Sequence, residues 1–264
     1  MRNAMYDSLK GKIALVTGAS GGVGQGCAVR LAAEGVRVVM IDIDDKGGKE
    51  TLGMIQAQGG QAIFQQADIS QTEQCRLAVQ KAVDTFGGLD ILLNNAGIFP
   101  RSYLEETTEE FYDRMLGINL KGPFFLCKYA VPIMKKRGGG SIINTGSVHG
   151  LGGDSRLAAY AVSKGGLLTM TKNLAVGLAK HKIRVNYMIP GWVLSATERR
   201  IRSEMGQDEN WLKAQELHLP MGFQTPKDSA NLVAFLASDD SAMITGCIIN
   251  VDAGHSVRCI GADD

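Results

Sequence analysis

Short apolar runs alternate with longer amphipathic stretches along almost all of this 264-residue chain. Strands that are covered on both faces read as continuous runs of Ile, Val and Leu. Such runs occupy Lys12–Thr17, Arg37–Ile41, Ala62–Gln66, Asp90–Leu93, Ser141–Thr145, Arg184–Met188 and Cys247–Val251. Helices are expected at Gly22–Glu34, Lys46–Gln58, Thr72–Phe86, Glu109–Lys136, Ala158–Lys180 and Pro226–Ala237. The alternation predicts a doubly wound, mostly parallel sheet of seven strands with helices on both faces.

This pattern belongs to the α/β class with a Rossmann-like architecture. Such domains reach this length undivided, and the chain shows no linker, repeat or low-complexity segment, so we expect a single domain over residues 1–264. The longest stretch outside the alternation is Trp192–Phe223. It follows a strand, at the edge of the sheet where ligands bind, and is expected to cover the substrate.

Composition excludes several classes of protein. The net charge of +1 gives no field that favours nucleic acid or an anionic membrane. Met1–Lys10 lacks the apolar core of a signal peptide, and no apolar run approaches the roughly 20 residues that span a bilayer. No spacing of His, Cys and carboxylates is typical of a metal site. We expect a cytoplasmic protein with a small-molecule substrate.

The cysteines form no CxxC pair and are odd in number, so buried free thiols in a reducing compartment are expected. They are Cys27, Cys75, Cys127, Cys247 and Cys259.

A glycine-rich turn, TGASGGVG, joins the first strand to the first helix. Glycines let the backbone approach a pyrophosphate, whose charge the helix N-terminus favours. The residues placed for this contact are Gly18, Ser20, Gly22, Val23 and Gly24. A plain tight turn or a methyltransferase would explain the turn alone equally well.

Asp42 ends the second strand, 18 residues after Gly24. At this place a carboxylate accepts hydrogen bonds from both hydroxyls of an adenosine ribose and repels a 2′-phosphate. Its neighbours Gly21 and Ile43 supply no cation for that phosphate. The residue therefore favours NAD over NADP.

Two further strand ends are candidates for the nucleotide. Asp68 follows the third strand and is placed either to bind adenine or to cap the next helix. Asn95, Ala96 and Gly97 follow the fourth strand, where small residues and an amide suit a backbone that touches the cofactor.

Tyr160 and Lys164 stand four residues apart in a predicted helix and so share one face. An ammonium at about 4 Å supplies roughly the 4 kcal/mol that lowers a tyrosine pKa from about 10 to about 7. Ser147 ends the fifth strand, 13 residues before Tyr160, and can hydrogen-bond the same substrate oxygen. Asn119 is a poor helix former inside a predicted helix and marks a local irregularity. A chance helix-face pair remains the alternative for Tyr160 and Lys164.

Together, these motifs resemble the short-chain dehydrogenases/reductases over about residues 9 to 254. The resemblance implies a catalytic tetrad of Asn119, Ser147, Tyr160 and Lys164, in which the Asn119 backbone holds a water that relays protons to Lys164. It also implies that Lys164 binds the nicotinamide ribose. Further cofactor contacts implied by the pattern are Ile69, Pro190, Gly191, Val193 and Ser195.

Two positions depart from the family pattern. Ser195 stands where the family usually has Thr; it keeps the hydroxyl, although Thr197 competes for the role. Gly146 stands where the family often has a second Ser.

The expected function is NAD-dependent interconversion of a secondary alcohol and a ketone or aldehyde, with His149 and Trp192 as candidate substrate contacts. The charged insertion favours a sugar, polyol or small hydroxy acid. A 3-oxoacyl or hydroxysteroid reductase is the alternative, and a non-catalytic NAD sensor is a distant one. The resemblance also implies a homotetramer built by the helices within Glu109–Lys136 and Ala158–Lys180.

Overall fold

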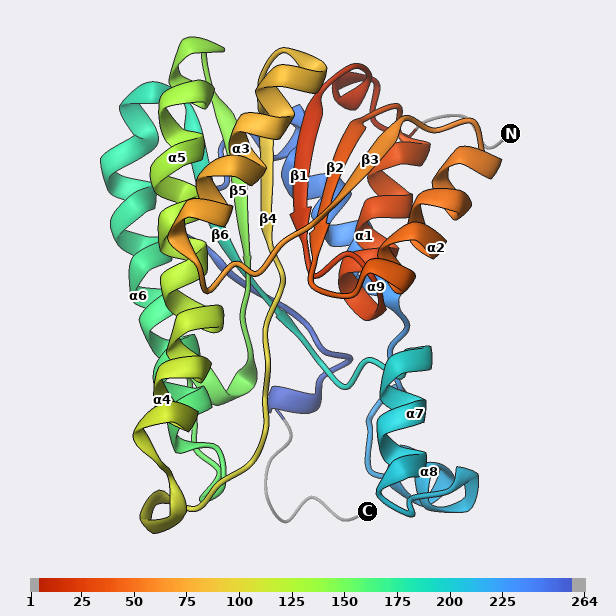
Figure 1. Ribbon diagram of the computed structural model, residues 1–264. Coiled ribbons are helices and arrows are strands. Elements are labelled where there is room, and N and C mark those ends of the chain that lie inside the picture. The colour runs from red at the N-terminus through yellow and green to blue at the C-terminus, as the bar shows by residue number, and fades with distance from the viewer. Residues whose placement is uncertain (1–4, 258–264) are drawn as a thin grey trace.

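The computed structural model describes residues 5–257, and its centre is one seven-stranded sheet (Figure 1). The strand order is β3-β2-β1-β4-β5-β6-β7, and every pairing is parallel. The strands are β1 (Ile13–Thr17), β2 (Arg37–Asp42), β3 (Ala62–Gln66), β4 (Ile91–Asn94), β5 (Gly140–Thr145), β6 (Ile183–Pro190) and β7 (Ile248–Val251). The predicted Rossmann-like sheet is confirmed, and its order reverses direction beside β1, the topological switch point where ligands bind.

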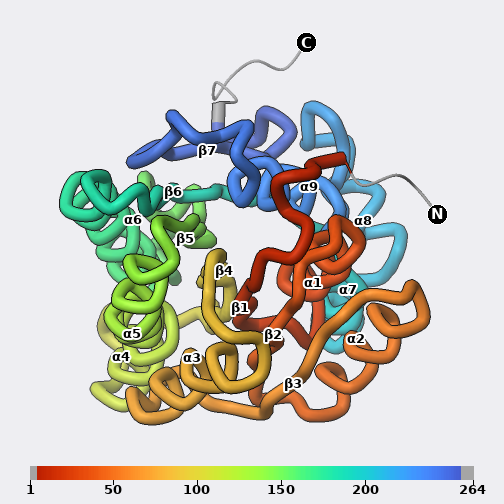
Figure 2. The backbone as a smooth tube through the Cα atoms, turned by 90° about the horizontal axis from the view of Figure 1, so that it is seen from above, coloured from red at the N-terminus to blue at the C-terminus, as the bar shows by residue number. Residues whose placement is uncertain are grey.

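Helices cover both faces of the sheet (Figure 2). One face carries α1 (Gly22–Ala33), α2 (Asp45–Ala57) and α9 (Pro226–Ala237). The other carries α3 (Thr72–Phe86), α5 (Gly122–Lys136) and α6 (Ala158–Leu178). Strand β1 shows why its sequence is continuously apolar: Ala14 and Val16 point into the first layer, while Ile13 and Leu15 point into the second.

The predicted helix Glu109–Lys136 is wrong as a single element. It consists of α4 (Glu109–Leu116), one π-helical turn (Gly117–Lys121) and α5. Asn119 lies inside the π turn, so the irregularity expected there is confirmed. Such turns commonly occur at functional sites.

The insertion at 192–223 contains two short helices that the sequence did not indicate, α7 (Ala196–Glu204) and α8 (Glu209–Glu216). Ser195 caps α7 by accepting a hydrogen bond from the Glu198 N–H, and Asp208 caps α8 through the Trp211 N–H. In Figure 1 both helices lie beyond the carboxyl ends of the strands.

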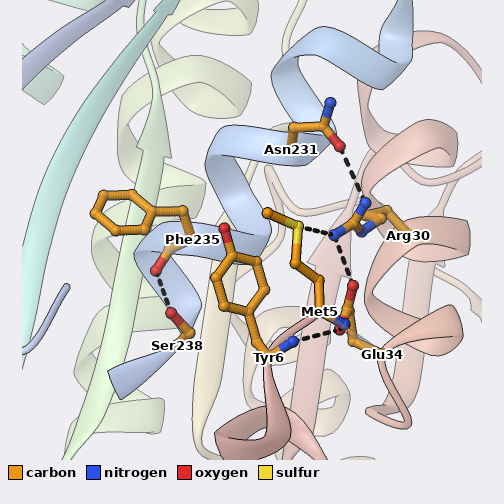
Figure 3. A network of polar contacts seen from close by, with 7 residues as sticks. All are labelled: Met5, Tyr6, Arg30, Glu34, Asn231, Phe235 and Ser238. Atoms are coloured by element: carbon orange, nitrogen blue, oxygen red, sulfur yellow. Dashed lines mark hydrogen bonds and ion pairs between the residues drawn. The ribbon is translucent and has the colours of Figure 1, made fainter. Parts of the chain in front are cut away.

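A buried carboxylate fastens the start of the chain to the helical layer (Figure 3). Glu34, at the end of α1, accepts the Met5 and Tyr6 N–H groups at 2.7 and 2.9 Å and pairs with Arg30 at 2.6 Å. Arg30 also donates to Asn231 of α9 at 3.1 Å. One ion pair therefore joins the N-terminal segment, α1 and α9.

The prediction of buried thiols is correct for three cysteines: Cys27, Cys75 and Cys127. It is wrong for Cys247, which is exposed because it precedes the edge strand β7, and Cys259 lies outside the described residues. Within residues 5–257, no group of three or more His, Cys, Asp or Glu is placed to hold a metal ion. No helix of this part of the chain is long and apolar enough to cross a membrane.

Candidate active site

A cavity of about 930 Å³ lies at the carboxyl edge of the sheet. Its walls come from the ends of β1, β2, β4, β5 and β6, from the loop after β4 and from α7. Figure 1 shows these strands ending at the same edge, so residues far apart in sequence converge there.

The glycine turn has the shape that a pyrophosphate requires. Gly18 has a φ of +68°, and a Cβ there would lie 2.8 Å from the Ala96 backbone. The N-cap of α1, Gly21, has no capping side chain, so the first N–H groups of the helix lack a side-chain partner at the cavity wall. These features fit the anionic part of a dinucleotide.

Gly24 lies behind this cradle instead of lining it. A Cβ on Gly24 would lie 2.0 Å from the Gly18 carbonyl oxygen, so the residue permits close packing of α1 against the turn. Its predicted cofactor contact is corrected to this supporting role. Gly18, Ser20, Gly22 and Val23 do line the cavity.

Asp42 presents a fixed carboxylate to the cavity. One oxygen accepts the Ser20 N–H at 2.9 Å, and the other accepts the Asp44 N–H at 3.0 Å. Asp44 lines the same wall, and Ile43 is 62% exposed. The cavity residues from Gly18 to Ser70 include no Lys, Arg or His. This end of the cavity is therefore acidic.

The remaining nucleotide candidates also reach the cavity: Asp68, Ile69, Asn95, Ala96 and Gly97. Asp68 accepts the Ser70 N–H at 2.8 Å, whereas the N-cap of α3 is Gln71. The helix-cap alternative for Asp68 is thus wrong, because the carboxylate stabilises the turn before the helix. Asn95 donates to the Thr17 carbonyl at 3.1 Å and so holds the glycine turn.

The end of β6 and the segment that follows it lie near the N-terminus of α1. Pro190, Gly191, Trp192, Val193 and Ser195 line the cavity. The Ser195 hydroxyl already accepts the Glu198 N–H at 3.1 Å as the cap of α7. A Cβ on Gly21 would lie 2.8 Å from the Thr197 hydroxyl, so both competing hydroxyls lie near the start of α1.

The structure brings the four predicted catalytic residues together. Ser147 and Tyr160 line the cavity, and the Ser147 side chain lowers the pKa of the Tyr160 phenol. Lys164 is buried behind them, where its Nζ donates to the Thr145 carbonyl at 2.8 Å and lies 5.7 Å from the centre of the Tyr160 ring. A Cβ on Gly97 would lie 3.2 Å from Asn119 Oδ1 and 3.5 Å from Lys164 Nζ, so these two side chains converge.

Asn119 acts through its side chain as well as its place in the backbone. Its amide accepts the Ile98 N–H at 2.9 Å and donates to the Ile98 carbonyl at 2.8 Å. The residue is fully buried. It thereby fixes the loop after β4, which forms one wall of the cavity.

Burial controls both titrating groups of the site. It raises the pKa of Tyr160, and the hydrogen bond from Ser147 opposes that rise. It lowers the pKa of Lys164 to about 8. The prediction that Lys164 alone brings the phenol pKa toward neutrality is therefore not supported, because desolvation dominates both groups.

The substrate side is aromatic and basic. The rings of Phe99 and His149 stand edge-on to Tyr160, at centroid distances of 6.4 and 6.2 Å. Trp192 donates to Glu198 at 3.0 Å. His149 and Trp192, the candidate substrate contacts, both line the cavity. Sequence reasoning missed Phe99, Arg101, Arg114, Arg200 and His255. They lie on loops and short helices whose course the apolar pattern does not determine.

The chain is similar to known proteins over almost all of its length. The sequence family described as Enoyl-(Acyl carrier protein) reductase matches residues 18–256. The 3beta-hydroxysteroid dehydrogenase 1 of Eggerthella lenta is 39% identical over 256 residues, which are 96% of this chain and 97% of that protein. A cyclohexanol dehydrogenase from Acinetobacter is 34% identical over 260 residues, or 98% of this chain and 100% of that protein.

A solved structure carries the family name itself. The crystal structure of a putative short-chain dehydrogenase/reductase from Burkholderia xenovorans has a TM-score of 0.90 and 34% identity, covering 96% of this chain and 100% of that one. The chain belongs to the short-chain dehydrogenase/reductase family and is an oxidoreductase that acts on CH–OH groups.

Proposed function

We propose that this protein interconverts a secondary alcohol and a ketone or aldehyde with NAD as the hydride carrier and Tyr160 as the acid/base. One observation carries the proposal: Ser147 and Tyr160 line the same cavity as the glycine cradle, with Lys164 Nζ 5.7 Å from the centre of the Tyr160 ring. A methyltransferase would leave that pair unexplained. A non-catalytic sensor has no use for a buried ammonium behind it.

Each catalytic side chain has a distinct role in this proposal. Tyr160 takes the proton from the substrate hydroxyl, and Ser147 hydrogen-bonds the same oxygen. Lys164 holds the nicotinamide ribose while its Nζ stays bonded to the Thr145 carbonyl. When bound, the oxidised nicotinamide supplies the hydride acceptor and a positive charge that favours the Tyr160 phenolate.

The acidic end of the cavity supports NAD. The Asp42 carboxylate is oriented by two backbone N–H groups, and Asp44 adds a second negative charge nearby. A 2′-phosphate would meet both charges, with no basic side chain among the cavity residues from Gly18 to Ser70. Single-domain organisation, a cytoplasmic setting and a homotetramer remain parts of the same proposal.

Basic side chains support a polar and preferably anionic substrate, such as a small hydroxy acid. Arg101, Arg114 and Arg200 line the cavity. The one carboxylate among the cavity residues on this side, Glu198, is already paired with Arg202 at 2.7 Å. Arg200 is also paired, with Glu204 at 3.4 Å. A carboxylate on the substrate would therefore meet the positive charge of Arg101 and Arg114.

A second candidate is an alcohol on an apolar ring. The edge-on rings of Phe99 and His149 beside Tyr160 favour it, because a flat ring packs between aromatic walls. Two of the relatives are named for alcohols on rings, cyclohexanol and a hydroxysteroid.

The test is a panel of hydroxy acids, sugars, polyols, cyclohexanol and a 3β-hydroxysteroid, each with NAD and NADP, followed by the absorbance of the reduced nicotinamide. We expect turnover with NAD, and Tyr160→Phe should lower kcat by at least about a hundredfold while the Kd for NAD stays near that of the parent. Tyr112→Phe, an exposed tyrosine of α4, is the control. Near-parental kcat in Tyr160→Phe would remove the proposed acid/base.

A further inference from the structure

Tyr187 is a fully buried tyrosine of β6 that lies directly beneath the catalytic residues. Its hydroxyl accepts the Ser147 N–H at 3.3 Å and donates to the Lys164 carbonyl at 3.0 Å. One oxygen atom therefore links the loop that carries Ser147 to the helix that carries Tyr160 and Lys164. Burial raises the pKa of Tyr187, so the hydroxyl remains a donor at neutral pH.

The backbone around Ser147 is shaped for this ring. A Cβ on Gly146 would lie 2.0 Å from Tyr187 Cε1, and a Cβ on Gly150 would lie 2.8 Å from the Tyr187 hydroxyl. No side chain fits at Gly146 while the phenol stays in place. Gly146 is also one of the two positions where the chain departs from the family pattern, and the absence of a side chain there has a structural reason in Tyr187.

We infer that Tyr187 is a positioning residue, which holds Ser147 in place relative to Tyr160 in the cavity. Ser147 is fixed at two points: its N–H by Tyr187, and its hydroxyl by the His149 N–H at 3.2 Å. The inference rests on the proposed roles of Ser147 and Tyr160. Without the Tyr187 hydroxyl, the buried Ser147 N–H lacks its partner, and the bond that opposes the rise of the Tyr160 pKa weakens.

The first test measures that pKa directly and needs no substrate. Tyrosine labelled with ¹³C at Cζ is followed by NMR across a pH titration, with NAD present and absent, and Tyr160→Phe assigns the Tyr160 signal. We expect Tyr187→Phe to raise the pKa of Tyr160 by roughly half a pH unit or more. Where an alcohol from the panel is turned over, kcat should fall by roughly tenfold while the Kd for NAD changes less than about twofold.

The matched control is Ser141→Ala. Ser141 stands at the other end of β5, is buried, and donates its hydroxyl to the Leu236 carbonyl at 2.7 Å. This variant also removes one buried hydroxyl and should lower stability, but the pKa of Tyr160 should stay at its parental value. If Tyr187→Phe matches Ser141→Ala in stability and in the pKa of Tyr160, Tyr187 is only structural and the inference fails.

The second test asks whether Gly146 and Tyr187 form a pair. Gly146→Ala alone should destabilise the protein because of the clash, and Tyr187→Ala alone should do so because it leaves a cavity. The double variant should be more stable than the two losses added together predict. Additive losses would show that the ring does not determine the residue at 146. The double variant also lacks the hydroxyl, so it serves the NMR test if Tyr187→Phe does not fold.

These outcomes separate the inference from the proposed function. If Tyr160→Phe retains activity, the assignment of the acid/base fails whatever Tyr187 does. If Tyr160→Phe is inactive and Tyr187→Phe leaves both the pKa of Tyr160 and kcat unchanged, only the positioning role fails.

Discussion

Asp42 lies at the end of β2, where the Ser20 and Asp44 N–H groups hold its carboxylate in place. It therefore offers a test of cofactor choice. One unit charge facing another at about 5 Å, in an effective dielectric near 20, is repelled by roughly 3 kcal/mol, or about a hundredfold in affinity. We therefore expect kcat/KM to favour NAD over NADP by about that factor. Asp42→Ala with Ile43→Arg should remove the repulsion, supply a phosphate partner and shift the ratio toward NADP.

The structure adds a requirement to that experiment. Asp42 accepts the Ser20 and Asp44 N–H groups, so alanine also loosens the glycine turn. Asp42→Asn with Ile43→Arg keeps an acceptor oxygen while removing the charge, and Asp45→Ala, on the exposed ion pair with Lys49, is the control. Parent enzyme that uses both cofactors equally would show that Asp42 does not select between them.

Lys164 gives stability a pH dependence. Its pKa falls from 10.5 to about 8 because the ammonium is buried. Below pH 8 the group is charged in both states, and the folded state bears the full cost of burial. Between about pH 8 and 10.5 the unfolded chain binds more protons at this site, so unfolding free energy rises with pH, by up to about 3 kcal/mol.

Denaturant unfolding between pH 7 and 10.5, without cofactor, tests this sign. The unfolding free energy of the parent minus that of Lys164→Met should increase as pH rises, since the methionine variant lacks the titrating group. Lys172→Met, an exposed lysine of the same helix, controls for the loss of a charge. If the parent value minus the variant value stays constant or decreases with rising pH, the burial of a charged Lys164 is contradicted.

Single residues were predictable where a motif fixes both type and spacing. The glycine turn, Asp42 and the Ser147, Tyr160 and Lys164 set follow from such motifs. Gly24 shows the limit: glycine was correctly expected at the turn, but whether it faces the ligand or the Gly18 carbonyl depends on packing. The pairing of Gly146 with Tyr187 joins the residue after β5 to one within β6, and no local pattern indicates it.

At the level of elements, the strands were the most predictable part. Each apolar run became a strand, because burial on both faces leaves little choice of residue. The helices α7 and α8 were not predicted, since each is short and polar. Each begins at a capping residue, Ser195 or Asp208. The π turn was visible only as an asparagine in a poor place for a helix.

That π turn has a testable function as an element. Asn119 turns inward from it and hydrogen-bonds both backbone groups of Ile98, which positions the loop after β4. Asn119→Ala leaves both groups without this partner, and we expect a loss of about 1–3 kcal/mol in unfolding free energy together with a clear fall in kcat.

The control for this variant is Asn173→Ala. Asn173 is exposed on α6, and its amide donates to the Thr169 carbonyl at 2.9 Å. That change should leave stability and kcat near parental values. If Asn119→Ala loses stability but keeps kcat, the residue supports the fold without shaping the site.

For the whole molecule, not every apolar side chain of the two helices predicted to join copies is available for contact. Leu126 of α5 and Leu167 of α6 are buried in the core of their own chain. Gly166 packs against Leu120 of the same chain, where a Cβ would lie 2.8 Å from the leucine side chain. Close approach to another copy is therefore not required to explain that glycine.

Other apolar side chains of α5 and α6 are exposed and available for assembly. Phe124 of α5 is 51% exposed, and Val162 and Val176 of α6 are 53% and 83% exposed. Figure 2 shows α5 and α6 at the outer edge of the molecule. Exposed apolar side chains on outer helices favour contact with a second copy.

We expect the parent to be a homotetramer at micromolar concentration, measured by light scattering after size exclusion. Phe124→Glu should shift it to smaller species. A two-fold axis repeats each contact, so an interface loses the burial of two phenylalanines, roughly 3–6 kcal/mol, which weakens association at least a hundredfold. Leu217→Glu, at the end of α8 and 86% exposed, replaces an apolar group away from this face and should leave the mass unchanged. A monomeric parent at this concentration, or equal masses for all three proteins, contradicts assembly through α5 and α6.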